Sequence, residues 1–379
     1  MERSTERILT THAGSLARPE GLKQLLLAKG AGKIVDSNEL DLAITQAVAE
    51  VVKKQAEAGV SVVSDGEQSK LGFAAYVSDR LAGFDGPELP RPVTLDARQF
   101  PDFGGRRDAQ TTRPACTRPV AWKDFSPVER DIANLRAALQ DVPSEDAFMP
   151  AASPGTIANW HPNRYYGSRE EYLNAIADVM KREYEAIAGA GFILQLDCPD
   201  LALHNTWFPD LTLEQFRREV AMNVEAMNYA TRDIPVESVR FHVCWGAGEG
   251  PHNHDPELRD LIDILLKGRA AAMSIVAANG RHEHEWKVWQ DVKPPDGMVL
   301  IPGVIDNTTN IIEHPVVVAD RIVRWANLLG RENIIAGVDC GFGTTITSQP
   351  PAVAPSVAWA KLQSLGEGAR LASEQLWGR

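Results

Sequence analysis

The chain has 379 residues, of which 44% are hydrophobic and 24% are charged, and its formal net charge is −12 at pH 7. This is the composition of a globular protein with enough apolar side chains for a large core. The acidic balance and the lack of long Lys/Arg runs argue against nucleic acids and acidic membranes as partners.

The N-terminal stretch MERSTERILTTHAGS is charged and lacks the apolar segment of a signal peptide. No uncharged apolar run approaches the roughly 18 residues that a membrane span needs. The four cysteines, Cys116, Cys198, Cys244 and Cys340, do not form the pattern of a disulfide scaffold. In a reducing compartment, thiols near histidines are better explained as metal ligands or nucleophiles than as disulfide partners. We therefore expect a soluble cytoplasmic enzyme with no membrane partner.

Short β-branched runs alternate with amphipathic helical patterns along the chain. Eight runs are predicted as strands, namely RILTTHAGS, GVSVVSDGE, AFMPAASPG, GFILQLDCP, VRFHVCWGA, AAMSIVAAN, MVLIPGVID and NIIAGVDCGFG. Several are almost continuously apolar, as expected for parallel strands that are covered on both faces. Helical patterns separate most of them, at residues 40–58, 168–190, 212–231, 256–267 and 315–329. This order predicts an α/β fold, a (β/α)₈ TIM barrel that forms a single catalytic domain over residues 1–379.

One region departs from this alternation. Residues 71–146 are rich in Pro, Gly, Arg and Asp and are too long for a plain loop. We expect an insertion after the second strand that packs over the barrel mouth.

Most of the predicted strands end in a polar or reactive side chain. These residues are His12, Ser15, Asp65, Glu67, Ser153, Asp197, Cys198, His242, Cys244, Asp306, Asp339 and Cys340. In a (β/α)₈ barrel the C-terminal ends of the strands build the active site. The pattern therefore predicts a catalytic site at that face.

His242, Cys244 and Cys340 form the most specific set. His242 and Cys244 are two residues apart in an apolar strand, so both side chains point to the same face. Cys340 lies in GVDCGFG, where glycines allow a close approach of the backbone. Imidazole and thiolate ligands suit Zn²⁺, and a catalytic zinc keeps one position open. The set predicts a zinc site, with buried structural cysteines as the alternative.

Such a site favours a particular chemistry. Zinc holds an added sulfur as its thiolate at neutral pH, and an electron-rich site leaves that sulfur nucleophilic. We therefore predict S-alkylation of a small-molecule thiol acceptor by an alkyl donor.

The motifs THAGSL, SDGEQS, SPGTIANW, QLDCPD, HVCWG, IPGVID and GVDCGFGT resemble, in this order, the C-terminal catalytic barrel of the cobalamin-independent methionine synthase family. The resemblance extends from about Thr10 to Thr344, and the N-terminal half of the full-length synthases is absent. Barrel-only members of the family include epoxyalkane:coenzyme M transferase. The resemblance implies the barrel fold, a Zn²⁺ cofactor and alkyl transfer to a thiol.

The family's zinc ligands match the three residues that were singled out above. The resemblance also implies that Ser15, Glu67 and Asp197 hold the amino-acid part of homocysteine and that Trp160 stacks on the folate ring. The alternatives are a turn cap for Ser15, salt bridges at the barrel mouth for Glu67 and Asp197, and a core position for Trp160.

Two positions depart from the family pattern. Val276 stands where the full-length synthases have a glutamate that ligates zinc, which leaves water, substrate, Glu283 or Glu285 for that position. Thr308 stands where they have a histidine that helps to protonate the folate leaving group, and threonine is no such acid near neutral pH. The sequence therefore leaves the identity of the alkyl donor open.

Histidines in two other segments are further candidates. In RHEHEW, His282 and His284 could supply the missing acid, bind an anionic substrate with Arg281, or form a solvated turn. We take His282, together with Asp306 at the end of the seventh strand, as the candidate catalytic residues. PHNHD, with His252 and His254, is interpreted as a polar loop.

Methyl transfer to homocysteine or a related thiol is the leading functional prediction. The runner-up opens an epoxide with a zinc-bound thiolate, which does not need the folate acid. A more distant alternative is a metal-free lyase of the uroporphyrinogen decarboxylase type, with Arg18, Arg106, Arg107 and Arg164 at the mouth. A binding module without catalysis leaves the thiolate set unexplained. The subunit number is open, a homo-oligomer included.

Overall fold

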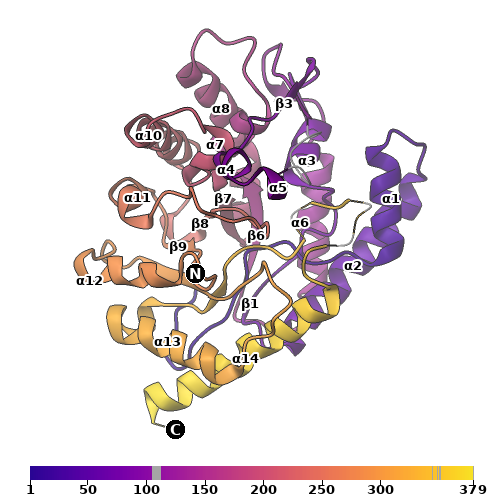
Figure 1. The fold of residues 1–379 in the computed structure, drawn as a ribbon. Helices are drawn as coiled ribbons and strands as arrows, with labels where there is room; N and C mark the ends of the chain where they lie inside the picture. Colours follow the sequence, from indigo (N-terminus) through magenta and orange to yellow (C-terminus); the bar gives the residue numbers. More distant parts are fainter. Residues whose placement is uncertain (105–111, 344, 348, 350, 379) are drawn as a thin grey trace.

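The main sheet is parallel and has seven strands (Figure 1). The structure is a computed structural model that describes residues 1–104, 112–343, 345–347, 349 and 351–378. In spatial order the strands are β1 (Val62–Ser64), β6 (Asp146–Ala152), β7 (Ile193–Asp197), β8 (Val239–Val243), β9 (Ala272–Ile275), β10 (Val299–Ile305) and β11 (Gly337–Val338). Each strand lies within a run that the sequence predicts as a strand, except that β6 begins at Asp146, one residue before its run.

The N-terminal segment joins the two edges of this sheet. On one side the amide of Thr11 donates to the carbonyl of Ala336, just before β11, at 2.9 Å. On the other side the amide of Val62 in β1 donates to the carbonyl of Thr10, also at 2.9 Å. Both pairings are parallel. Eight parallel segments therefore follow one another around a ring, which is the arrangement expected of a (β/α)₈ barrel.

Helices follow the strands and cover the outside of the ring. They are α2 (Ser37–Glu57), α6 (Ser126–Ala138), α8 (Arg169–Gly189), α10 (Leu213–Ala230), α11 (Leu258–Leu265), α12 (Val288–Asp291), α13 (Pro315–Leu329) and α14 (Pro355–Trp377). The five predicted helices correspond to α2, α8, α10, α11 and α13. Local signals explain where two of them begin. Thr212 and Gln215 form a capping box at the start of α10, and Pro315 is the first residue of α13.

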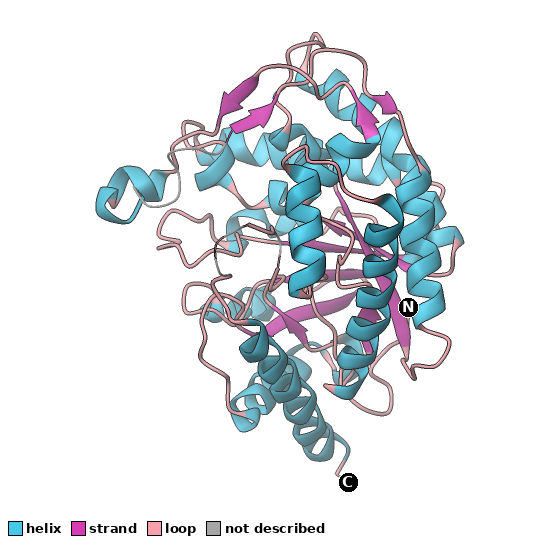
Figure 2. Cartoon of the chain, turned by 90° about the vertical axis from the view of Figure 1, so that its right-hand side faces the viewer, coloured by secondary structure: helices cyan, strands magenta, loops and turns pink. Residues whose placement is uncertain are grey.

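The connection from β1 to β6 is the longest part that departs from the strand–helix alternation. It contains α3 (Phe73–Arg80), α4 (Leu95–Gln99), α5 (Pro101–Gly104) and two antiparallel pairs, β2 (Leu81–Ala82) with β5 (Ala121–Trp122) and β3 (Glu88–Pro90) with β4 (Thr112–Pro114). Figure 2 shows these short strands apart from the main sheet. The connection contacts loops that follow strands, since Asp96 Oδ1 accepts from the amide of His254 and the carboxamide oxygen of Asn205 accepts from the amide of Asp96.

The last part of the predicted insertion belongs to the ring of helices. Residues 126–138 form α6, which contacts α2 and α8, and β6 begins at Asp146. The irregular part of the segment therefore ends before α6. Arg106 and Arg107, candidates for a lyase, lie outside the described residues.

Three further helices lie in connections: α1 (Glu20–Gly30), which packs on α2, α7 (Pro154–Trp160) after β6 and α9 (His204–Trp207) after β7. The strands are buried along almost their whole length, and one large apolar cluster fills the space between the strands and the helices. In the described part of the chain, no helix combines the length and the apolar character needed to span a membrane.

Candidate metal centre and active site

His242, Cys244 and Cys340 lie together at the C-terminal ends of the strands. His242 is in β8, Cys244 follows it, and Cys340 comes two residues after the end of β11. The two sulfur atoms are 3.1 Å apart, and one ligand atom from each of the three side chains lies within 4.8 Å of the others. All three residues are buried. The structure therefore brings together the three side chains that the sequence predicts as zinc ligands.

The orientation of the His242 ring leaves one nitrogen for a metal. Nδ1 is 3.1 Å from the hydroxyl oxygen of Ser274, its register partner in β9. Nε2 is buried and has no hydrogen-bond partner among the described residues. A buried nitrogen without a partner is rare in a folded protein, and metal-ligating histidines commonly have the other nitrogen fixed in this way.

The donor set fits Zn²⁺. Tetrahedral zinc with bonds of about 2.0–2.3 Å separates two ligand atoms by about 3–4 Å, which the cluster allows. The hydrogen bond with Cys340 lowers the pKa of Cys244, burial opposes this shift, and His242 adds to it. Burial alone would lower the pKa of His242, but the neighbouring Cys244 raises it. The surroundings thus favour a thiolate at Cys244.

A carboxylate does not complete the set among the described residues. Val276, aligned with the family's glutamate, is buried in the apolar core. Glu283 pairs with Arg321 at 3.3 Å, and Glu285 accepts from the amide of Leu258 at 2.7 Å. Neither glutamate therefore joins the cluster of His242, Cys244 and Cys340.

Asp339 fixes the loop after β9 against the end of β11. Its Oδ1 accepts from the amides of Ala277 and Ala278 at 2.8 Å, and its Oδ2 accepts from the amide of Asn279 at 2.7 Å. Burial raises the pKa of Asp339 to about 7, although these amide donors oppose the shift. Because Cys340 is the next residue, these bonds hold its backbone in place.

Glu67 presents an unpaired oxygen in a buried position. It has left-handed backbone with φ of 55°, and a Cβ on Gly14 would lie 2.7 Å from its Oε1. Its Oε2 is buried without a hydrogen-bond partner in the described part of the chain, and Arg18 Nη2 is 4.0 Å from it. Burial raises the pKa of Glu67 to about 8, and the charge of Lys70 opposes the shift. Arg18 and Lys70 bring positive charge near this carboxylate, but no described donor forms a hydrogen bond to its Oε2.

Ser15 and Asp197 lie beside the same cluster. A Cβ on Gly341, the residue after Cys340, would be 1.9 Å from the hydroxyl oxygen of Ser15. Asp197 ends β7 as the register partner of His242. Burial raises its pKa to about 6, and the charge of His242 opposes this shift. Ser15 thus lies beside the residue that follows Cys340, Asp197 is paired with His242, and the charge of Asp197 acts on Glu67.

A buried chain of polar groups orients Asp197. Arg240 donates through Nε to the carboxamide oxygen of Gln195 at 2.8 Å, and Gln195 donates to Asp197 Oδ1 at 2.7 Å. Arg240 also donates to the carbonyl of His12 at 3.1 Å and lies over the ring of Phe148. This network inside the ring of strands holds the carboxylate in one orientation.

Arg18 ties together the loops that carry these groups. It donates to the carbonyls of Leu16, Glu67, Lys70 and Gly343 at 2.6–2.9 Å. Its Nη1 and Nη2 donors are therefore engaged by backbone, which removes it as a carboxylate clamp for the lyase alternative.

The remaining predicted residues lie at other places on this face. His282 is buried between Glu285 and Asp255, with Nδ1–Oε2 and Nε2–Oδ2 distances of 3.1 and 3.3 Å. Asp306 accepts from the amides and hydroxyls of Thr308 and Thr309, so its carboxylate closes its own loop. Catalytic roles for His282 and Asp306 stay predictions from the sequence.

Trp160 ends α7 and stacks on Phe73, with ring centroids 6.2 Å apart. Its ring is partly buried against the main core. The contact agrees with the core alternative and leaves the predicted stacking on a donor as a prediction.

A cavity of about 340 Å³ opens next to the cluster, and we call it the mouth cavity. Trp245 and Gly246, which follow Cys244, line it together with Asp96 of α4 and with His252 and Asp255 of the loop after β8. Sequence reasoning assigned PHNHD to a plain polar loop, so it missed the position of His252.

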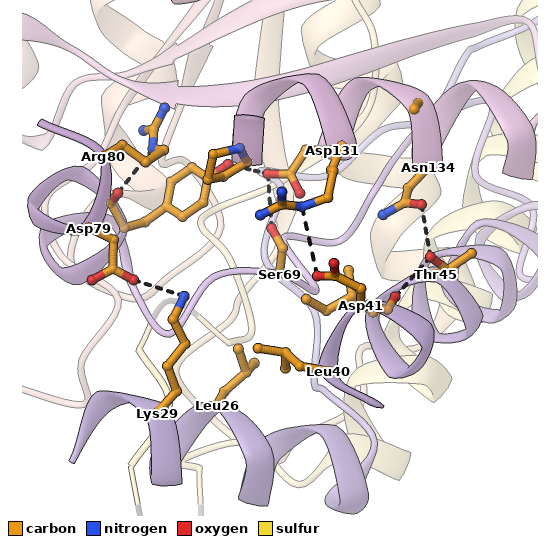
Figure 3. A pocket seen from close by; sticks show the side chains of 15 residues that line it. Leu26, Lys29, Leu40, Asp41, Thr45, Ser69, Asp79, Arg80, Asp131 and Asn134 are labelled. Atoms are coloured by element: carbon orange, nitrogen blue, oxygen red, sulfur yellow. Dashed lines mark hydrogen bonds and ion pairs between the residues drawn. The ribbon is translucent and has the colours of Figure 1, made fainter. Parts of the chain in front are cut away.

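A separate cavity of about 160 Å³ lies between α1, α2, α3 and α6. Figure 3 shows the side chains that line it. Lys29 pairs there with Asp79 at 3.1 Å, and the hydroxyl of Ser69 donates to Asp131 at 3.0 Å. Its lining includes none of the predicted site residues. Of these two cavities, only the mouth cavity is lined by residues that are next to Cys244 in the chain, Trp245 and Gly246.

No protein-family model matches the chain. It is 26% identical over 370 residues to a methionine synthase of Sulfurisphaera tokodaii, which covers 97% of this chain and 93% of that protein. A methionine synthase of Thermococcus kodakarensis is 24% identical over 334 residues, or 88% of this chain and 86% of the relative.

Two solved structures share the fold. A B12-independent methionine synthase from Shewanella sp. W3-18-1, in complex with selenomethionine, has a TM-score of 0.76 at 19% identity and covers 98% of this chain and 100% of its own. A putative vitamin-B12 independent methionine synthase from Listeria monocytogenes has a TM-score of 0.64 at 19% identity, with the same coverage. The predicted α/β fold with a parallel sheet is confirmed.

Proposed function

We propose that the chain is a zinc-dependent alkyltransferase that transfers a methyl group to homocysteine or a related thiol. The observation that carries the proposal is the buried cluster of His242, Cys244 and Cys340, in which the imidazole Nε2 has no other partner among the described residues. Similarity over nearly the full length to proteins named methionine synthase supports the same assignment.

The three ligands would hold Zn²⁺ with one open position, where the metal keeps the acceptor sulfur as its anion at neutral pH. The protein's own groups prepare this site. Ser274 fixes the His242 ring, and the amide of Gly246 donates to the Cys244 sulfur at 3.2 Å. That amide stabilises negative charge on the sulfur.

We assign the polar end of the acceptor to Ser15, Glu67 and Asp197. An ammonium group beside Glu67 gives its Oε2 the missing donor, and the opposite charges favour the ionised carboxylate. An acceptor with an amino group, such as homocysteine, therefore suits the position beside Glu67. The sulfonate of coenzyme M would instead place a second negative charge beside this carboxylate. The geometry thus favours homocysteine over coenzyme M.

The alkyl donor is proposed to occupy the mouth cavity, between α4 and the loop after β8. One observation favours the epoxide-opening alternative. Thr308, at the position of the family's acid, is engaged with Asp306, so this loop offers no proton for a folate donor.

The experiment combines metal analysis with a choice of acceptors. The purified chain is expected to hold about one zinc per chain and to transfer methyl groups from methyl-tetrahydrofolate to homocysteine. In Glu67→Gln we expect the KM for homocysteine to rise by about 30-fold or more, because a buried charge pair is broken. The KM for 4-sulfanylbutanoate, which lacks the amino group, is expected to change little.

The matched control is Glu57→Gln, an exposed position at the end of α2, which is expected to leave both constants unchanged. Alkylation of coenzyme M by epoxypropane, without methyl transfer to homocysteine, would move the assignment to the epoxide-opening alternative. A purified chain without metal would remove both transferase assignments.

A further inference from the structure

Four ionisable side chains form a second buried cluster beside the mouth cavity. Asp255 Oδ2 lies between two imidazoles, 2.6 Å from His252 Nδ1 and 3.3 Å from His282 Nε2. His282 Nδ1 is in turn 3.1 Å from Glu285 Oε2. The side chains of Asp255, His282 and Glu285 are almost fully buried, whereas that of His252 is 14% exposed. His252 is therefore the member of the chain that reaches solvent.

The backbone of His252 is held in an unfavourable conformation. Its φ is 53°, and among the described non-glycine residues only Glu67 shares a positive φ. Such strain persists where the surrounding structure enforces it, and it concentrates at functional sites. Two contacts of the ring hold His252 in this conformation. Nε2 is 3.0 Å from the carbonyl oxygen of Gly248, and Nδ1 is 2.6 Å from Asp255 Oδ2.

The imidazole of His252 faces the position where the donor is proposed to bind. His252 and Asp255 line the mouth cavity. A Cβ on Gly246 would lie 3.6 Å from Cε1 of the His252 ring, and the amide of Gly246 donates to the sulfur of Cys244. Gly246 thus lies between the imidazole of His252 and the sulfur cluster, by which we mean His242, Cys244 and Cys340.

We propose that His252 is the acid that protonates the leaving atom of the alkyl donor, with Asp255 and His282 as its positioning residues. This inference rests on the proposed alkyl transfer. The sulfur anion of the acceptor attacks the alkyl carbon, the S–C bond forms, and the bond from carbon to the leaving atom breaks. The electron pair stays on that atom, which takes the proton from His252 Nε2. This N–H is bound to the carbonyl oxygen of Gly248 in the structure, and the leaving atom would replace that carbonyl as its partner. Solvent in the cavity then reprotonates His252.

The charges around His252 support a protonated ring. Burial lowers its pKa, but the hydrogen bond and the charge of Asp255 raise it above the ordinary value. His282 opposes this shift through its own charge. Across the cavity, Asp96 is already bonded to Asn205 and to the amide of His254. Arg91 also lines the cavity.

The test compares two methyl donors whose leaving groups differ in their need for a proton. The nitrogen of methyl-tetrahydrofolate needs protonation as it leaves, whereas iodide from methyl iodide does not. With homocysteine as acceptor, we expect His252→Gln to lower folate-dependent kcat by about 10²–10⁴-fold. Transfer from methyl iodide, after subtraction of the uncatalysed rate, is expected to change less than about threefold.

The matched control is His254→Gln in the same loop, where His254 Nε2 contacts Gln99 at 2.6 Å outside the cluster. It is expected to keep both rates. Asp255→Asn should shift the alkaline limb of the folate-dependent kcat profile to lower pH, which loss of structure alone would not do. Zinc content and the unfolding midpoint report on the integrity of each variant.

Equal losses with both donors, or an unchanged folate-dependent rate in His252→Gln, would overturn the role of His252 and leave the proposed function standing. Absence of transfer from methyl-tetrahydrofolate in the unsubstituted chain would overturn the inference together with the proposed methyl transfer.

Discussion

Two clusters at the same face of the barrel each place three metal-ligand side chains within 4.8 Å, yet they differ in how their nitrogens are used. In the sulfur cluster, His242 Nε2 has no partner among the described residues. In the cluster around Asp255, both nitrogens of His252 and His282 have oxygen partners. Closeness of ligand atoms is thus not enough to indicate a metal site. A ligand nitrogen without any other partner is the more informative sign.

The two clusters also differ in their support. The sulfur cluster stands at the ends of β8 and β11 and is held by Ser274 and Asp339, so rigid elements set its geometry. The Asp255 cluster joins two loops and depends on opposite charges. We expect acid to release a bound metal from the sulfur cluster, because the thiolates of Cys244 and Cys340 become protonated. Alkaline pH should weaken the second, because its histidines lose their charge.

The largest effect is expected for Cys340→Ala. Loss of one of three protein ligands should lower zinc affinity by more than about 10²-fold, since changes in merely supporting partners already cost about 10–100-fold. Methyl transfer should fall with the metal. Metal analysis after dialysis under reducing conditions measures this loss.

Cys198→Ala is the matched control, because Cys198 is also buried near a strand end but contacts the carbonyl of Leu196 and the sulfur of Met227. It is expected to retain zinc. Stoichiometric zinc in Cys340→Ala would contradict the proposed centre and erase the difference between the two clusters.

A smaller effect is expected for Ser274→Ala. Its hydroxyl fixes the Nδ1 side of His242, and loss of such a partner lowers metal affinity by about 10–100-fold. Competition with a chelator of known affinity measures the change. Ser373→Ala, whose hydroxyl donates to the carbonyl of Ala369 in α14, serves as the control. Equal affinities in both variants would show that the strand pairing alone orients the imidazole.

The sequence predicted the strand pattern because parallel strands buried on both faces leave a strong signal in short apolar runs. It also predicted that His242, Cys244 and Cys340 lie together, because side chains two apart on a strand share one face and the strand ends converge. Ser274 is likewise a polar residue in an apolar strand, which indicates a special role. Its contact with His242 depends on the register between β8 and β9, which the sequence does not give.

The Asp255 cluster was not predictable in this way. Its members come from the loop after β8 and from the segment after β9, where Glu285 lies in a short 3₁₀ helix. Asp255 and His282 are 27 residues apart in the chain, and such segments have no regular spacing from which their contact could be predicted. The α6 helix was missed for a related reason. A Pro- and Gly-rich stretch precedes it, and the whole region was assigned to one insertion.

The smallest measured change is expected in the dependence of the unfolding midpoint on pH. Burial lowers the pKa of His282, but its hydrogen bonds to Asp255 and Glu285 raise it to about 9 from an ordinary value of 6.5. The folded state therefore binds this proton more tightly than the unfolded state. The resulting stability is complete below pH 6.5 and is lost as the pH rises toward 9. The shift corresponds to about 3 kcal/mol, which the midpoint of unfolding reports as a drop of a few °C. His282→Gln should flatten this drop, whereas His254→Gln should retain it. An equal slope in both variants would show that the charge of His282 does not hold the two loops together, and His252 would then lack the support on which its role as an acid depends.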